Sequence, residues 1–272
     1  MTELEKKECQ AIDLIRSASR QHEYVVSYSG GKDSQVLLHL FKLARVSYQI
    51  IYKNTTIDPP GTLGFVTRNG ATILEPRRSF FELIRKKGLP SFSRRFCCSE
   101  LKEGYVSKYL SLGIRAAESK NRYERYNSPE SCRKYTKTKV TCQLLPLVFW
   151  SEDDIRDYIV NAGVNCHPLY YDEQGVFHAE RRLGCMGCPL PWDRSKDDFY
   201  QYPILVRLWC RNLDVFRKTH PNSSACTLFS NAYEQFAHNL FYHDYNKFKL
   251  TTTGFFPVDW REKLSKLFNI IL

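Results

Sequence analysis

The sequence predicts an α/β protein with a doubly wound parallel sheet, followed by a helical C-terminal region. As far as Pro191, short apolar segments typical of buried strands alternate with amphipathic helical segments, which is the pattern of a parallel sheet with right-handed crossovers. Beyond Pro191 the pattern becomes helical and rich in aromatic residues. We therefore expect an α/β domain at residues 1–191 and a helical region at residues 192–272.

The expected elements follow from their residues in order. A buried strand at 23–27 leads through a glycine turn into a helix at 33–44. The helix at 151–163 begins at an N-cap, Ser151, carries acidic residues in its first turn and ends at a glycine. Ligands of such sheets bind beyond the carboxyl ends of the strands. The other expected elements are helices at 11–21, 60–70, 79–87 and 99–110 and strands at 47–54, 71–76, 112–116 and 144–150.

Composition and charge favour an anionic partner. The chain has 40 basic and 29 acidic residues and a net charge of +11, and such a field attracts nucleotides, nucleic acid or a membrane surface. No apolar run approaches the roughly 18 residues of a membrane span, and the first ten residues are charged where a signal peptide is apolar. We expect a cytoplasmic protein that does not bind a membrane, with clustered cysteines serving metal or redox chemistry.

The turn at residues 29–34, Ser-Gly-Gly-Lys-Asp-Ser, suits a phosphate. Glycines allow backbone N–H groups to converge on an anion at a helix N-terminus. The Walker pattern does not fit, because Val26 and Asp33 replace its first glycine and its hydroxyl residue. An ordinary glycine turn is the alternative. The stretch resembles the loop of the N-type ATP pyrophosphatases, adenine nucleotide α-hydrolases that split ATP between its α and β phosphates. That resemblance implies ATP with Mg²⁺, Lys32 offsetting the phosphate charge, Asp33 near the metal or the loop, and a pyrophosphate cradle of Ser29, Gly30, Gly31 and Ser34.

Two cysteine pairs, Cys97-Cys98 and Cys185-x-x-Cys188, supply four thiolates of the kind that bind zinc or an iron–sulfur cluster. The segments "FCCSELK" and "GCMGCP" resemble the signature of the phosphoadenosine phosphosulfate reductase family, in the branch that carries a [4Fe-4S] cluster. That resemblance implies that these four cysteines bind the cluster and that Lys102 lies near it and the substrate. Zinc, or cysteines that are merely buried, are the alternatives. Cys9, Cys132, Cys142, Cys166 and Cys210 are assigned to packing.

Other segments extend the resemblance and also depart from it. "GIRAAESKNR" is similar to a family segment and implies that Arg115, Glu118 and Ser119 line the nucleotide site. In "NTTIDPPGTLGFV", Asn54 remains for the nucleotide, but other family positions are substituted. The reductases carry a degenerate phosphate loop and a tail with a nucleophilic cysteine, whereas this loop is intact and the chain ends "FPVDWREKLSKLFNIIL". This combination resembles ATP-dependent sulfur-insertion enzymes such as the DNA phosphorothioation proteins.

The expected activity is therefore adenylation of a substrate by ATP for sulfur transfer, with Lys32, Asp33 and Lys102 as catalytic residues. Nucleic acid is the expected acceptor, because eight basic residues meet three acidic ones between Arg115 and Lys139, with Tyr123, Tyr126 and Tyr135 available to stack on bases. A solvated surface loop is the alternative. A sulfur-donor protein, such as a cysteine desulfurase, is a further expected partner. The competing hypotheses are a sulfonucleotide reductase and a zinc-stabilised nucleic-acid-binding module without turnover.

Overall fold

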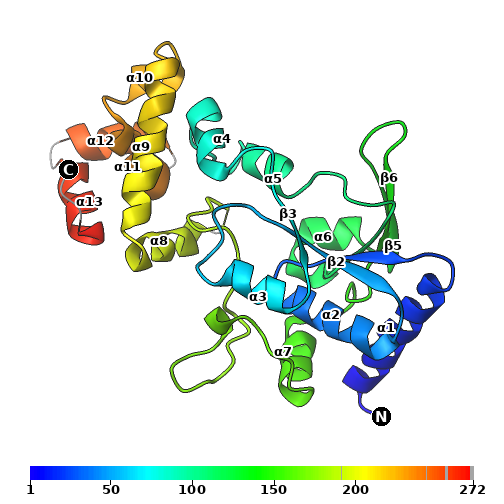
Figure 1. Cartoon of the computed structure of the whole chain (residues 1–272). Coiled ribbons are helices and arrows are strands. Elements are labelled where there is room, and N and C mark those ends of the chain that lie inside the picture. The colour runs from blue at the N-terminus through cyan, green and yellow to red at the C-terminus, as the bar shows by residue number, and fades with distance from the viewer. Residues whose placement is uncertain (191, 243, 255–256, 270–272) are drawn as a thin grey trace. The chain divides into compact units, whose positions relative to one another are not determined.

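The computed structural model describes residues 1–190, 192–242, 244–254 and 257–269, with the backbone alone for residues 192–195. Its chain divides into two compact units, each built from separated segments (Figure 1). Unit 1 comprises Met1–Asn54, Asp58–Glu75 and Glu103–Gly184, and unit 2 comprises Thr55–Ile57, Pro76–Lys102 and Cys185–Leu272. The predicted boundary after residue 191 follows chain order, whereas unit 2 also takes in two earlier segments.

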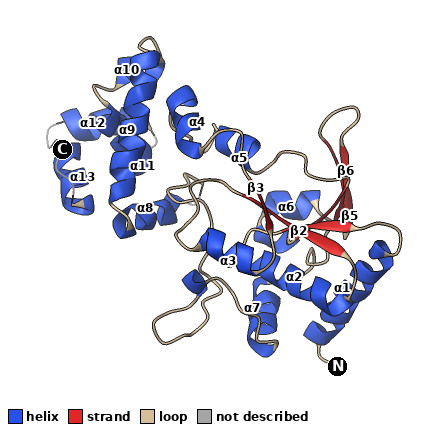
Figure 2. Cartoon of the chain, viewed as in Figure 1, coloured by secondary structure: helices blue, strands red, loops and turns tan. Residues whose placement is uncertain are grey.

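Unit 1 contains a six-stranded sheet in the order β3-β2-β1-β4-β6-β5. All neighbouring strands are parallel except β5 and β6, which are antiparallel (Figure 2). The predicted α/β class with a mostly parallel sheet is thus confirmed. The strands are β1 (Tyr24–Ser27), β2 (Tyr48–Lys53), β3 (Thr72–Leu74), β4 (Tyr109–Leu112), β5 (Glu130–Lys134) and β6 (Val140–Leu144).

The strand order places a topological switch between β1 and β4. From β1 the chain builds outward through β2 to β3, and it then returns to β4 on the other side of β1. The loops after β1 and β4 therefore leave the sheet in opposite directions, and the space between them is where open α/β sheets bind ligands. Residues 28–31 and 113–119 lie in these two loops.

The helices of unit 1 bury apolar faces against the sheet and each other. Helix α2 begins directly after the glycine turn, and α1 and α7 both pack against it. Ile15, Leu37, Phe41 and Ile155 are fully buried in the shared core with Val26 of β1. The helices are α1 (Glu3–Ser19), α2 (Lys32–Ala44), α3 (Thr62–Arg68), α6 (Lys120–Arg125) and α7 (Glu152–Asn161), with short 3₁₀ turns η1 (Ala116–Glu118) and η2 (Pro168–Tyr170).

In its described residues, unit 2 is helical, and it has its own hydrophobic core. Helix α4 packs against α9. Leu83 and Ile84 of α4 and Leu213 of α9 are fully buried in one cluster that also contains Trp209 and Phe236. No described helix is both long and apolar enough to cross a membrane. The helices of unit 2 are α4 (Phe80–Lys87), α5 (Phe96–Leu101), α8 (Trp192–Gln201), α9 (Ile204–Thr219), α10 (Ser224–Leu228), α11 (Ala232–Phe241), α12 (Tyr245–Thr253) and α13 (Trp260–Phe268).

Several predicted elements differ from the structure. The helix expected at 11–21 is α1, which already begins at Glu3 and ends at Ser19. The strand expected at 112–116 is β4, Tyr109–Leu112. Gly113 and the residues after it belong to the loop that follows this strand. The strand expected at 144–150 is wrong, since β6 ends at Leu144 and the following apolar run enters the core through turns before α7. The helix expected at 99–110 ends at Leu101.

Candidate active site

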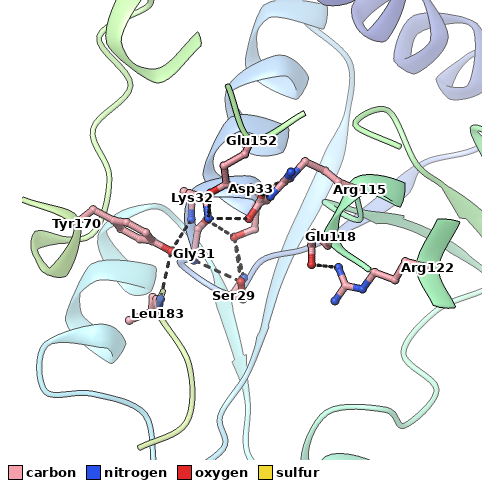
Figure 3. A network of polar contacts seen from close by, with 11 residues as sticks. Ser29, Gly31, Lys32, Asp33, Arg115, Glu118, Arg122, Glu152, Tyr170 and Leu183 are labelled. Carbon is pink, nitrogen blue, oxygen red and sulfur yellow. Dashed lines mark hydrogen bonds and ion pairs between the residues drawn. The ribbon is translucent and has the colours of Figure 1, made fainter. Parts of the chain in front are cut away.

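The glycine turn between β1 and α2 is braced by its own serines (Figure 3). Ser34 Oγ accepts a hydrogen bond from the Ser29 N–H at 3.2 Å and donates one to the Gly31 carbonyl at 2.9 Å. Ser29 Oγ accepts from the Gly31 N–H at 3.3 Å. Gly30 has φ 76°, and a Cβ there would lie 3.2 Å from Leu183 Cδ2 and from Val66 Cγ1. The two serines thus hold the backbone conformation that only glycine adopts readily at position 30.

The first turn of α2 presents backbone donors toward the switch point. Its N-cap, Gly31, has no side chain that could accept from the N–H groups of the helix. The positive end of the helix dipole is therefore not offset by a capping side chain, a condition that favours an anion. The phosphate-binding role that the sequence predicts for residues 29–34 stays a prediction.

Four charged side chains form one ion-pair network beside this turn (Figure 3). Lys32 Nζ lies 3.0 Å from Glu152 Oε1 and 3.9 Å from Asp33 Oδ2. Arg115 donates from Nε to Asp33 Oδ1 at 2.5 Å and from Nη2 to Glu152 Oε2. Two cations thus alternate with two carboxylates, and the group is neutral overall.

Arg115 is the most buried member of this network, with a side chain that is only 4% exposed. Burial alone would lower the pKa of Arg115, but the charges of Asp33 and Glu152 outweigh it and raise the pKa. Burial would likewise raise the pKa of Glu152, but Lys32 and Arg115 lower it. Glu152 is 49% exposed at its side chain, so it is the member of the network most open to an incoming ligand.

The hydroxyl of Tyr170 occupies part of the backbone donor set. It accepts hydrogen bonds from the N–H of Lys32 at 3.1 Å and of Leu183 at 3.2 Å. Tyr170 lies in η2 and is buried. Its phenolic oxygen therefore satisfies the backbone N–H of the first residue of α2.

Gly113, at the end of β4, lies against the backbone of α2. A Cβ at this position would be 3.0 Å from the Asp33 carbonyl carbon and oxygen and 3.1 Å from the Ser34 nitrogen. Any larger residue would therefore push the first turn of α2 away. This close approach explains how Arg115, two residues later, reaches Asp33.

The structure separates the other predicted nucleotide residues from this network. Asn54 donates to both carboxylate oxygens of Glu75, at 3.1 and 2.9 Å. Glu118 pairs with Arg122. Ser119 is the N-cap of α6 and accepts from the Arg122 N–H at 3.2 Å. Local contacts thus explain these three side chains, and their nucleotide role stays a prediction.

The four predicted cluster cysteines all lie in unit 2 and influence one another. The pKa of Cys97 is raised by a hydrogen bond with Cys98 and by burial. The nearby thiols of Cys185 and Cys188 raise it further. The same hydrogen bond, with the charges of Arg95 and Lys102, lowers the pKa of Cys98 to about 6. The charge of Lys102 also counters the burial that raises the pKa of Cys188, whereas the predicted role of Lys102 toward a cluster and substrate stays a prediction.

The donor set fits a thiolate-bound metal group. Four soft sulfur ligands with basic neighbours are the environment of iron–sulfur and zinc sites. Within the described residues, no three His, Cys, Asp or Glu side chains converge on a point suited to a single metal ion. Binding of a cluster or of zinc by these four cysteines stays a prediction.

Backbone contacts fix the Cys185–Cys188 loop within unit 2. The Met186 N–H donates to the Ile57 carbonyl at 2.8 Å, and the Gly187 N–H donates to Asp198 Oδ2 at 2.7 Å. Gly187 has φ 67°, and a Cβ there would lie 2.5 Å from Phe199 Cζ. The loop can therefore carry only glycine at this position.

The tyrosines of the basic stretch at 115–139 differ in their exposure to solvent. Tyr123 is 71% exposed, but Tyr126 is buried, so the prediction that Tyr126 stacks on bases is wrong. Arg133 lies over the Tyr135 ring at 4.8 Å, and Lys139 lies over the ring of Tyr105 at 5.6 Å. Among the cysteines assigned to packing, Cys9 and Cys132 are exposed, so that assignment is wrong for them.

Sequence reasoning missed Glu152, Tyr170 and Gly113 as parts of the site. Glu152 was read only as an acidic residue in the first turn of a helix. The glycine in "SLGIRA" carried a signal, since an isolated glycine at a strand end marks close backbone approach. Nothing near Tyr170 in the sequence connects it with residues 29–34.

Comparisons with known proteins identify the family to which this chain belongs. A family model described as the phosphoadenosine phosphosulfate reductase domain matches residues 23–191. That segment covers more than half of the chain, and the chain belongs to this family. The mostly parallel sheet is consistent with the adenine nucleotide α-hydrolase fold that the resemblance implied.

Individual relatives are distant. An uncharacterized protein of Methanocaldococcus jannaschii is 25% identical over 240 residues, covering 79% of this chain and 53% of that protein, so the chain spans about half its length. The sulfate adenylyltransferase subunit 2 of Nocardia farcinica is 27% identical, covering 63% of this chain and 67% of that protein. The adenosine 5'-phosphosulfate reductase of Streptomyces coelicolor is 24% identical, covering 68% and 79%. A crystal structure of phosphoadenylyl-sulfate reductase from Candida auris has a TM-score of 0.44 and 14% identity, covering 61% of this chain and 89% of that one.

Proposed function

We propose that this protein binds ATP at the turn of residues 29–34 and adenylates a substrate for sulfur transfer, with release of pyrophosphate. The observation that carries the proposal is the neutral network of Lys32, Asp33, Arg115 and Glu152 at the switch point, beside a helix N-terminus whose N-cap is a glycine. A polyphosphate entering there meets backbone donors and two cations. Two relatives are named for sulfate adenylylation and for adenosine 5'-phosphosulfate reduction. Their names support a ligand in which an adenylyl group is joined to an oxyanion.

The residues of the chain then act mainly by position and charge. A substrate oxygen attacks the α-phosphorus, the bond to the β-phosphate oxygen breaks, and pyrophosphate leaves carrying the electron pair. The turn amides and Lys32 stabilise the charge that develops on the leaving group. Arg115 is a positioning residue, because its contacts hold Asp33 and Glu152 around Lys32. Mg²⁺ would enter with ATP. Both carboxylates are already paired with cations, so we assign them no metal-binding step.

Sulfur transfer is the further part of the proposal. A [4Fe-4S] cluster held by Cys97, Cys98, Cys185 and Cys188 would supply electron transfer or sulfur binding when present. Lys102 and Arg95 stabilise thiolate at Cys98. Nucleic acid is the proposed acceptor. Its support is the exposed ring of Tyr123 and the tyrosines at 105 and 135, over whose rings Lys139 and Arg133 lie. A separate sulfur-donor protein, such as a cysteine desulfurase, completes the scheme.

Pyrophosphate release from ATP by the anaerobically purified protein tests the proposal, with DNA or tRNA as acceptor. Replacing Lys32 with methionine removes the charge and keeps the length, and we expect release to fall by roughly 100- to 1,000-fold. Lys42→Met is the matched control, because Lys42 is exposed near the other end of the same helix. Equal rates for the two variants would contradict the proposal, as would a wild-type protein that neither binds nor cleaves ATP.

A sulfonucleotide reductase is the second candidate, and its support is the relative named adenosine 5'-phosphosulfate reductase. That function predicts tight binding of adenylyl sulfate and weak binding of ATP. Calorimetric titration with both nucleotides distinguishes the candidates. A colourless zinc protein that binds nucleic acid and neither nucleotide would leave the non-enzymatic module.

A further inference from the structure

Two cysteines outside the proposed site face each other across the antiparallel strands of unit 1. Cys132 of β5 is the register partner of Cys142 of β6. Hydrogen bonds from the Leu145 N–H to the Pro129 carbonyl and from the Tyr135 N–H to the Lys139 carbonyl mark the hydrogen-bonded pairs on either side. Because such pairs alternate along an antiparallel ladder, Cys132 and Cys142 form a non-hydrogen-bonded pair.

This type of pair has the spacing that a disulfide needs. Its Cα atoms are about 4.5 Å apart and its side chains are closer than in the other type, while disulfides span roughly 4.4–6.8 Å between Cα atoms. Directly opposed residues of an antiparallel pair carry their side chains on the same face of the sheet, and burial and the Cys132 side chain raise the pKa of Cys142. Both are free, with Cys132 exposed and Cys142 half-buried. A small reagent can therefore reach the pair without unfolding.

We propose that Cys132 and Cys142 are a reversible redox site, which a low-molecular-weight disulfide such as oxidised glutathione converts into a cross-strand disulfide. The Cys132 thiolate attacks one sulfur of the small disulfide and releases one small thiolate. The Cys142 thiolate then attacks the Cys132 sulfur and releases the second. The protein loses two protons and two electrons, and the small disulfide is reduced to two thiols.

The order of the two attacks follows from the surroundings. Cys132 is the more exposed thiol. The pKa of Cys142 is raised by burial and by Cys132, whereas the charge of Lys108 lowers it by a smaller amount. Disulfide formation would lock β5 to β6 in the strand pair that carries Arg133 and Lys134. The inference is independent of the proposed ATP site and of the four cysteines in unit 2.

Peptide mapping tests the proposal. The folded wild-type protein is equilibrated with oxidised glutathione, its thiols are blocked with N-ethylmaleimide, and it is digested with trypsin. Cleavage after Arg125, Arg133, Lys139 and Arg156 gives peptides 126–133 and 140–156. We expect these two peptides linked, lighter than their sum by two hydrogens, and separated again by dithiothreitol.

Two variants separate the steps. In Cys142→Ser, Cys132 should accumulate as a mixed disulfide with glutathione, and in Cys132→Ser, Cys142 should react more slowly. Cys9→Ser is the matched control, since Cys9 is an exposed thiol on α1 and its loss should leave the linked peptides unchanged. The proposal fails if wild-type protein gives the mixed disulfide on Cys132 without the linked peptides, or if the link appears only in denaturant.

Discussion

The phenolic hydroxyl of Tyr170 accepts a hydrogen bond from the backbone N–H of Lys32. A side chain from a distant segment thus occupies a backbone donor of the turn at residues 29–34. The same hydroxyl accepts from Leu183, so it also joins the segment before Cys185 to the turn. A ligand that takes the Lys32 amide must displace this oxygen.

Tyr170→Phe should therefore destabilise the free protein and favour the nucleotide. The variant leaves two backbone donors without their acceptor, and we expect the free energy of unfolding in urea to fall by about 1–3 kcal/mol. Addition of ATP should restore part of that loss. Tyr171→Phe is the control, because the Tyr171 hydroxyl accepts from the Cys166 N–H and not from the turn. An equal response of both variants to ATP would contradict this role of Tyr170.

Replacing Arg115 with lysine should weaken both stability and activity. A single ammonium cannot reproduce the two directed contacts of the guanidinium with Asp33 and Glu152. Because these carboxylates are partly exposed, we expect a loss of about 1–3 kcal/mol, less than for a fully buried pair. Arg156→Lys alters an exposed pair with Asp153 and Asp157 and should leave the free energy of unfolding nearly unchanged. Urea titrations of both variants give the comparison.

Gly113→Ala should disturb the turn directly. Its Cβ would meet the backbone of Asp33 and Ser34, so α2 must shift, at a cost of about 1–3 kcal/mol. A displacement of that kind should lower ATP-dependent pyrophosphate release by roughly 100-fold. Gly104→Ala is the control, since nothing lies within 4 Å of a Cβ there. Wild-type rates in Gly113→Ala would show that the close approach is not needed.

The Lys7–Asp154 pair should make stability depend on pH in the acid range. Lys7 Nζ lies 2.6 Å from Asp154 Oδ2. Burial would raise the pKa of Asp154, but the hydrogen bonds from Lys7 and Ser151 lower it. The contribution is complete above the ordinary aspartate pKa of about 3.9 and is lost as the pH falls through the lowered value.

We expect Lys7→Met to cost about 1–2 kcal/mol near pH 7, and this difference from the wild type should shrink below about pH 4. Lys6→Met, which removes an exposed pair with Glu3, should show little change at either pH. Urea unfolding measured from pH 7 to pH 3 checks both expectations. A difference for Lys7→Met that stays constant over this range would exclude the pair as its cause.

Loss of one cysteine from unit 2 should remove the proposed cluster. Anaerobically purified wild-type protein should be brown and contain iron, and Cys188→Ser should lose both the colour and the iron. Cys9→Ser should retain them, because Cys9 lies on α1 in unit 1. Metal analysis with visible absorbance decides the matter. Bound zinc without iron would replace the cluster with the alternative ligand.

Local sequence signals predicted much of the fold. The glycine turn, the N-cap at Ser151 and the apolar strands were visible because each depends on neighbouring residues. The apolar run at 144–150 was misassigned, since a short buried strand and a buried loop share the same composition. Pro146 within the run was the sign against a strand.

The site was less predictable, because its members come from separate elements. Lys32 and Asp33 could be found from their motif, and Arg115 from its family segment. Glu152 completes the ion pairs through the fold alone, and its acidic character was already explained by the helix dipole. The hydroxyl of Tyr170 reaches the turn through the packing of η2, which no local pattern encodes.

The composite make-up of unit 2 has a consequence for how the protein is made. Phe80, Leu83 and Ile84 share a core with residues of α9 and α11, which the ribosome produces only after the whole sheet of unit 1. Domains generally fold as they are completed during synthesis. The apolar side chains of α4 and of the segment with Cys97 and Cys98 therefore stay exposed until α9 and α11 have been synthesised. Cys97 and Cys185, which pack against this core, thus gain their final surroundings only after α9 and α11 have been synthesised.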